Sequence, residues 1–138
     1  MTERLTAGLQ GHASTQVTEQ NTATHWGSGE LDVFSTPHMV ALMECAAVDA
    51  VDKHLSEGHK SVGTVVNVRH LASTPVGNPV EAHATLVEVD GCRLLFDVVA
   101  YSADVKIGDG SHERFVVQVD RFMECTNARR EGDDTSQT

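Results

Sequence analysis

One stretch of this chain is suited to a long helix, and it precedes a series of β-rich runs. Residues 39–54 contain no Gly or Pro and are rich in Ala, Leu and Met, which favour helix. Thr36 and Pro37 come just before it, where Thr is a good N-cap and Pro is tolerated because its missing N–H is not needed. Gly58 is a natural stop. The pattern predicts one long helix from Thr36 to near Gly58.

Runs rich in β-branched residues lie on both sides of this helix. Before it, Ala13, Thr15 and Val17 alternate with polar neighbours, which indicates a strand. After it come SVGTVVNVRHLAST, PVEAHATLVEV, CRLLFDVVAYSA and KIGDGSHERFVVQVDRF, and the step VDGC contains Asp-Gly, the preferred tight hairpin turn. The order predicts an α+β fold, in which one long helix covers a face of a five-stranded antiparallel sheet.

The length of 138 residues fits a single domain, which at this size buries roughly two-thirds of the surface that the unfolded chain exposes. Both ends are polar and aperiodic. We therefore expect a flexible N-terminus over residues 1–12, a folded domain over residues 13–125, and a flexible C-terminal tail over residues 126–138.

Composition and charge exclude several classes of partner. The formal net charge is −10 and the basic residues are scattered, which argues against binding to nucleic acid. No apolar run approaches the ~18 residues of a membrane span, and the opening MTERLTAGLQ lacks the pattern of a secretory signal. Three widely spaced cysteines fit neither a disulfide framework nor a zinc site. We expect a cytoplasmic protein with reduced thiols and no membrane partner.

A single carboxylate interrupts the apolar helix. Glu44 shares a helix face with Val40, Met43, Ala47 and Val48, whereas Asp49 and Asp52 fall where an outer face would begin. Glu is almost never fully buried without a partner, so a solvated position is the commoner interpretation of Glu44 taken alone. The other interpretation is an anion held against the core for chemistry.

His70 extends a valine stripe on the run that begins at Ser61. A strand repeats every two residues, so one face should carry Val62, Thr64, Val66, Val68, His70 and Ala72. A valine face is the one that the helix should cover, which would bring His70 to the helix. Taken alone, His70 is more often a structural histidine than a catalytic one. The eight histidines show no paired spacing of ligands, and we expect no metal site.

The segment between the first strand and the helix, TATHWGSGELDVFS, contains two glycines and no periodicity. Such a loop beside a pocket is typical of a mobile lid.

The ordered set VFSTPHMVALMECAAVDAV, SVGTVVNVRHLASTPVG, VDGCRLLFDVVA and IGDGSHERFVV resembles the hot-dog fold acyl-CoA thioesterases, and within them the fluoroacetyl-CoA thioesterase type. The resemblance covers roughly residues 31 to 123. It implies a hot-dog fold, a homodimer with active sites near its interface, and hydrolysis of a small acyl-CoA thioester. It implies no separate cofactor, because coenzyme A is part of the substrate.

The resemblance also implies a catalytic constellation of Thr36, Glu44 and His70. Gly63 and Arg114 would line the substrate site. Each catalytic residue has an ordinary structural explanation, but those explanations do not predict all three at the family's spacing.

The loop departs from the family. The fluoroacetyl-CoA enzyme has aromatic lid residues, and the matching positions here are Gly27 and Glu30, with Trp26 and Phe34 close by as expected substrate contacts. We therefore expect poor discrimination between fluorinated and other short acyl groups.

Hydrolysis of a thioester requires an activated water or a carboxylate nucleophile, and donors for the oxyanion. Glu44 could be the general base or the nucleophile, with His70 as proton shuttle and Thr36 as orienting group. Because the chain is acidic, Arg69, Arg93 or Arg114 would have to bind the phosphates of coenzyme A locally.

Two alternatives remain. One is a noncatalytic acyl-CoA-binding hot-dog module, which would use the same pocket without turnover. The other is a hot-dog enoyl-CoA hydratase, which would need an Asp/His pair that the start of the helix lacks.

Overall fold

A computed structural model describes residues 5–131 of the chain. Its main feature is a curled sheet of five antiparallel strands in the order β1-β3-β4-β5-β2. The strands are β1 (Gln10–Gln16), β2 (His59–His70), β3 (Pro79–Asp90), β4 (Arg93–Ser102) and β5 (Val105–Gln118). The predicted Asp-Gly turn joins β3 to β4, with Gly91 at a positive φ of 61°. β1 and β2 are the two edges of the sheet.

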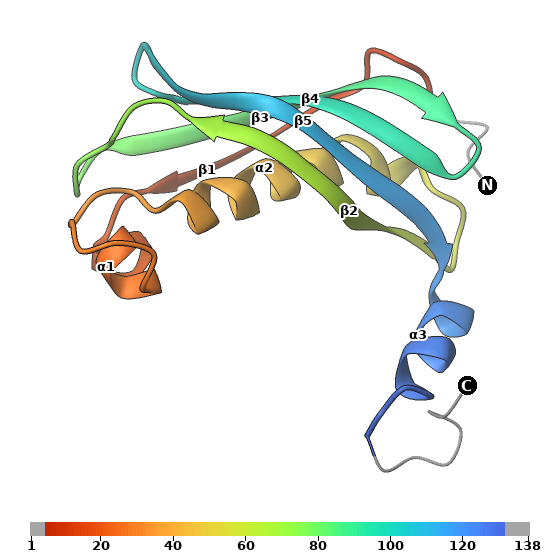
Figure 1. Cartoon of the computed structure of the whole chain (residues 1–138). Helices are drawn as coiled ribbons and strands as arrows, with labels where there is room; N and C mark the ends of the chain where they lie inside the picture. Colours follow the sequence, from red (N-terminus) through yellow and green to blue (C-terminus); the bar gives the residue numbers. More distant parts are fainter. Residues whose placement is uncertain (1–4, 132–138) are drawn as a thin grey trace.

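The long helix, α2 (Thr36–Val51), packs against the concave face of the sheet (Figure 1). Its inner side is Met-, Leu- and Ala-rich and meets alternate residues of β3 and β4. The core contains Met39, Leu42, Met43, Ala46, Ala47 and Ala50 from the helix, and Ala82, Ala84, Leu86, Leu94, Phe96 and Ala100 from the sheet. This is the predicted α+β arrangement of one helix on a five-stranded antiparallel sheet.

The helix lies unusually close to β1. A Cβ atom added at Gly11 would lie 2.3 Å from the carbonyl oxygen of Ala46 and 2.4 Å from the backbone nitrogen of Ala50. These are backbone atoms, so a side chain at position 11 could be accommodated only by moving the helix away from the sheet.

Residue-level boundaries differ from the prediction at both ends of α2. The side-chain cap is Ser35, whose Oγ accepts a hydrogen bond from the His38 backbone N–H, so Thr36 is the first helical residue and not the cap. The regular helix ends at Val51, and a short 3₁₀ turn, η2 (Asp52–His54), follows before the positive-φ Gly58.

The segment predicted as a lid contains structure that periodicity did not reveal. The first strand ends at Gln16, and η1 (Glu19–Asn21) and α1 (Ala23–Trp26) follow, capped by the side chains of Thr18 and Thr22. Short elements of this kind are specified by caps and turns, which a hydrophobic pattern does not detect.

The C-terminal prediction was also wrong in part. The last run was expected to remain a strand to Phe122 and to give way to a flexible tail at residue 126. Instead β5 ends at Gln118, whose side chain caps α3 (Val119–Asn127). This helix projects from the far end of the sheet relative to α1 (Figure 1). The ends of the predicted flexible segments, residues 1–4 and 132–138, lie outside the described residues.

Within the described residues, the longest apolar helix falls short of what would be needed to cross a membrane.

The approach of α2 to β1 gives a first prediction. Gly11→Ala should lower the free energy of unfolding by about 1–3 kcal/mol or more, the usual scale for overpacking a filled core. Gly29→Ala is the matched control, because its new Cβ would make only an ordinary 3.4 Å contact with the Ala23 Cβ. Urea unfolding at fixed protein concentration measures both. Equal stability of the two variants would contradict the tight contact.

Candidate active site

Thr36 and His70 lie together although they come from different elements. The Oγ1 atom of Thr36, at the start of α2, shares a 2.7 Å hydrogen bond with Nδ1 of His70, at the end of β2. Because Ser35 caps the helix, the Thr36 hydroxyl is available for this contact. The other ring nitrogen of His70, Nε2, is buried and has no hydrogen-bond partner among the described residues. The pair therefore presents an imidazole with one nitrogen fixed and one available to a ligand.

A pocket of about 260 Å³ opens at this pair. Its walls come from the lid segment, the start of α2 and the end of β2, and they include Phe34, Thr36 and His70. The buried Phe34 ring packs edge-on against His70, with 6.5 Å between the ring centroids. Phe34 thus lines the pocket.

Trp26 stands further out. It is 51% exposed and packs edge-on against His38, which in turn packs against Phe34. The neighbouring Gly27 has a φ of 71° and ends α1, a conformation that an aromatic residue adopts only with strain. Gly27 therefore provides the left-handed backbone conformation that ends α1, and it also leaves the lid without an aromatic side chain at this position.

Glu44 faces a different part of β2. A Cβ atom added at Gly63 would lie 2.6 Å from Oε2 of Glu44, so only glycine allows the carboxylate this close to the strand. The same oxygen lies 3.7 Å from Nη1 of Arg114 on β5. The Glu44 side chain is 40% exposed, so Glu44 is neither fully solvated nor buried. Glu44, Gly63 and Arg114 form one cluster.

A β-bulge explains which β2 residues face the helix. The register with β5 shifts between Gly63 and Val65, so Gly63 pairs with Arg114, whereas Val66 pairs with His112 and His70 with Gly108. Residues opposite one another share a face. The predicted inner face is therefore correct for Val66, Val68 and His70. It is wrong for Val62 and Thr64, because the bulge reverses the alternation between the two halves of the strand.

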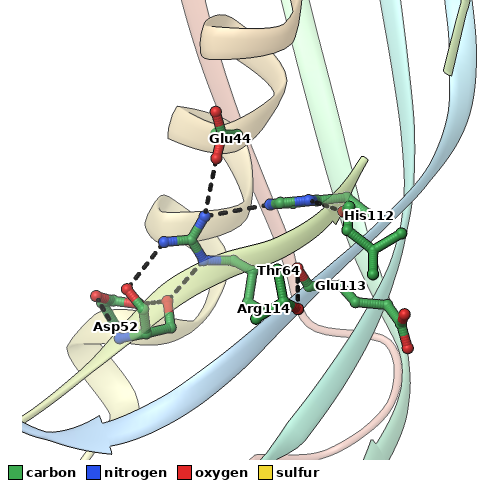
Figure 2. A network of polar contacts seen from close by, with 8 residues as sticks. Glu44, Asp52, Thr64, His112, Glu113 and Arg114 are labelled. Carbon is green, nitrogen blue, oxygen red and sulfur yellow. Dashed lines mark hydrogen bonds and ion pairs between the residues drawn. The ribbon is translucent and has the colours of Figure 1, made fainter. Parts of the chain in front are cut away.

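Arg114 is held by a polar network that sequence patterns did not indicate (Figure 2). Its Nε donates to Ser61 Oγ (2.7 Å), its Nη2 donates to the Ser61 carbonyl oxygen (2.9 Å), and its Nη1 lies 3.1 Å from His112 Nε2. Ser61 Oγ in turn donates to Oδ1 of Asp52 (2.6 Å). Asp52 is thus part of the site's support and not the outer-face residue that its helical position predicted.

The three arginines expected to bind phosphates are all paired within the chain. Arg69 contacts Asp109, with 3.1 Å between Nη2 and Oδ1, and Arg93 contacts Glu88 and Glu113. The side chain of Arg114 is only 7% exposed. Arg114 is therefore placed to interact with the Glu44 carboxylate and not with a phosphate at the surface.

The predicted catalytic residues fall into two clusters in one chain. Thr36 and His70 form the first, at the pocket, and Glu44 forms the second, with Gly63 and Arg114. Gly63 and His70 are seven residues apart on β2, and the bulge removes about one step, which leaves about 20 Å along the strand. Thr36 and Glu44 are separated by about 12 Å of helical rise. One chain alone does not bring Glu44 to His70.

Burial affects the histidines of both clusters. Loss of hydration disfavours the imidazolium and lowers the pKa of His38, His70 and His112 below the usual value. For His70 the backbone of Ala72 acts more weakly in the opposite direction on the pKa. For His112 the nearby positive charge of Arg114 also lowers the pKa, whereas the Val65 carbonyl and Glu44 act in the opposite direction. At neutral pH these rings are neutral, the form in which an imidazole can accept a proton.

Comparison with known proteins places this chain in a family. The sequence profile of the fluoroacetyl-CoA-specific thioesterases (FlK) matches residues 17–120, which include every predicted site residue. The chain belongs to this thioesterase family. A curated fluoroacetyl-CoA thioesterase from Streptantibioticus cattleyicolor is 43% identical over 91 residues, and the match spans 66% of each chain.

Solved structures of FlK and of similar proteins have the same fold. A variant of FlK crystallised with fluoroacetate and CoA is 35% identical, covers 86% of this chain and 99% of its own, and has a TM-score of 0.80. A hot-dog-like protein from Thermanaerovibrio acidaminovorans is 28% identical, covers 95% and 97%, and has a TM-score of 0.85. A thioesterase superfamily member from Thermus thermophilus is 27% identical, covers 94% and 96%, and has a TM-score of 0.86. The predicted hot-dog fold and the enzyme class, thioester hydrolase, are confirmed.

The buried histidines predict how stability depends on pH. Because the pKa of His70 is depressed in the folded chain, the unfolded chain takes up the proton first, at about pH 6.5. The contribution of the neutral ring is fully present above that pH and is lost as the pH falls toward the folded-state pKa. Urea unfolding between about pH 7.5 and 5.5 should show a steeper loss of stability for the wild type than for His70→Asn. Equal slopes would contradict the depressed pKa.

Proposed function

We propose that this thioesterase-family protein hydrolyses a short acyl-CoA thioester to the free acid and coenzyme A. The observation that carries the proposal is the Thr36–His70 hydrogen bond at a pocket, with the buried Nε2 of His70 left for a ligand. A neutral imidazole oriented by a hydroxyl is suited to proton transfer at a carbonyl centre.

The size of the pocket supports a small acyl group. Its volume of about 260 Å³ is smaller than that of most ligand pockets, which commonly measure about 300–1,000 Å³. The lid adds no aromatic side chain at Gly27 or Glu30. We infer that the enzyme accepts several short acyl groups and shows little preference for a fluorinated one.

Glu44 supplies the remaining catalytic group in this proposal. As a carboxylate it can attack the thioester carbonyl or remove a proton from a water that does so. Thr36 orients the reacting group, and His70 carries the proton to the leaving thiolate. The positive end of the α2 dipole favours negative charge on the carbonyl oxygen during the reaction.

We further propose a homodimer in which each site is shared between two chains. β2 is an edge strand, and its Val65 and Val66 are 43% and 42% exposed. Open, valine-rich edges tend to pair with another strand. A partner with the chemistry of this edge is a second copy of the chain, related by a two-fold axis.

Antiparallel pairing of two β2 edges would join the separated clusters. In a register centred on Asn67, Gly63 of one chain lies across from His70 of the other, because the bulge leaves Gly63 and His70 each three strand steps from Asn67, and both lie on the inner face. Glu44, which sits over Gly63, would then face the partner's His70. This arrangement supports a site with Glu44 from one chain and the Thr36–His70 pair from the other.

The cytoplasm is the proposed compartment. Cys45 and Cys125 are exposed free thiols, which persist in a reducing environment.

Incubation with a panel of short, branched, aromatic and halogenated acyl-CoAs tests the proposal. Release of free thiol indicates a thioesterase, loss of enoyl absorbance indicates a hydratase, and binding without either indicates a noncatalytic module. We expect thiol release with short acyl groups, and rates for fluoroacetyl-CoA and acetyl-CoA within the same order of magnitude. Absence of thiol release across the panel would contradict the proposed function.

The catalytic roles predict non-additive losses. Glu44→Gln and His70→Ala should each lower kcat by about 10²–10⁴-fold, the usual contribution of a general acid or base, and the double variant should lose little more. Glu124→Gln, the same chemical change on the exposed surface of α3, is the control and should retain full turnover. If Glu44 were only a solvated helix residue with no catalytic role, Glu44→Gln would also leave kcat unchanged.

A further inference from the structure

His112 is a buried histidine to which the proposed reaction assigns no role. It lies on β5 and is 1% exposed, with its ring stacked 6.1 Å from that of Phe96 on β4. Its two ring nitrogens contact two different elements of the site. Nδ1 lies 2.7 Å from the carbonyl oxygen of Val65 at the β2 bulge, and Nε2 lies 3.1 Å from Nη1 of Arg114.

These partners fix the protonation state of His112. A carbonyl oxygen only accepts hydrogen bonds, so Nδ1 must carry a hydrogen. A guanidinium only donates, so Nε2 must offer a lone pair. Both contacts are made together only by the neutral Nδ1–H tautomer. In this form His112 is at once an anchor for the bulge and an acceptor for Arg114.

The Nη1 atom of Arg114 is shared between His112 and Glu44. It lies 3.7 Å from Oε2 of Glu44 and 3.1 Å from His112 Nε2 (Figure 2). The other side of the guanidinium is fixed by Ser61, which donates to Asp52. The guanidinium of Arg114 is planar, so the position of Nη1 relative to the Glu44 carboxylate depends on the contacts with Ser61 and with His112 together. The contact with His112 is the one made by Nη1 itself.

We propose that His112 is a positioning residue for the thioesterase reaction: as a neutral Nδ1–H imidazole it holds Arg114 so that Nη1 orients the Glu44 carboxylate. The role rests on the proposed function, since it acts through Glu44. The bond to Val65 serves the same end, because the bulge sets how closely Gly63 approaches Glu44.

Protonation of His112 would break this arrangement. A hydrogen on Nε2 would point at a donor, and two cations would lie in contact in a buried place. The charged groups that face the ring are Arg114 on its own strand and Glu44 on α2, with Asp52 beyond Ser61. Burial and the charge of Arg114 lower the pKa of His112, which keeps the ring neutral at physiological pH.

Two substitutions separate positioning from folding. His112→Asn places an amide N–H near the position of Nδ1, so it retains a donor for Val65 and loses the acceptor for Arg114. His112→Gln places its carbonyl oxygen near the position of Nε2, so it retains the acceptor and cannot be protonated. Both variants remove the ring that stacks on Phe96, and each is therefore the other's control for lost packing.

We expect His112→Asn to lower kcat for the best acyl-CoA of the panel by about 10- to 100-fold, the scale of a slightly misplaced catalytic group, with little change in KM. His112→Gln should recover most of kcat. Its acid limb in the kcat–pH profile should be less steep than that of the wild type, because one titrating group is gone. Unchanged kcat in His112→Asn, or an equal loss in both variants, would overturn the proposal.

A measurement on the folded protein covers the case in which a variant folds poorly or the wild type hydrolyses nothing. Nitrogen-15 NMR of the wild-type imidazole should show His112 with a hydrogen on Nδ1 and none on Nε2 at neutral pH. The carboxyl carbon-13 resonance of Glu44 should move as His112 is protonated in acid. A hydrogen on Nε2 at neutral pH, or a Glu44 resonance indifferent to His112, would overturn the proposal. Absence of hydrolysis with both NMR results as expected would contradict the proposed function alone.

Discussion

The close approach of α2 to the sheet is the constraint on which the site depends. At Gly11 there is no room for a single methyl group between β1 and the backbone of Ala46 and Ala50. Small residues on both surfaces, among them Ala82, Ala84 and Ala100, let the helix lie this deep in the curled sheet. That depth fixes two distances at once: Thr36 reaches His70 at one end of β2, and Glu44 reaches Gly63 near the other. A helix packed on larger side chains would hold neither contact.

Much of this architecture could be predicted from sequence because it follows from periodicity and turn chemistry. The Ala-, Leu- and Met-rich run, which contains no Gly or Pro, predicted α2. The β-branched runs, two of them joined by Asp-Gly, predicted the sheet. The features that escaped prediction depend on geometry between distant segments. The bulge at Gly63–Val65 cannot be recognised from the alternation of residue types along the sequence, so Val62 and Thr64 were predicted on the wrong face. Ser35 and Thr36 are both residues that favour the N-cap position. Only the position of His70 shows that the Thr36 hydroxyl makes another contact and does not cap the helix.

The supporting residues were harder still to recognise. Ser61 lies 53 residues from Arg114 in sequence, and the Val65 carbonyl lies 47 residues from His112. Nothing in the local sequence SHERF distinguishes a buried histidine from a surface one. Family membership brought Thr36, Glu44, His70, Gly63 and Arg114 to notice, whereas the network that holds Arg114 became visible only in three dimensions.

The separation of Glu44 from His70 in one chain is the central claim, and mixing two inactive variants tests it most directly. Glu44→Gln and His70→Ala chains with different tags are combined under conditions that allow subunit exchange. If each site takes Glu44 from one chain and His70 from the other, every mixed dimer contains one intact site. A one-to-one mixture should then regain about a quarter of wild-type hydrolysis, since half of its dimers are mixed and each has one of two sites intact. No recovery, with mixed dimers demonstrated through their tags, would contradict the shared site.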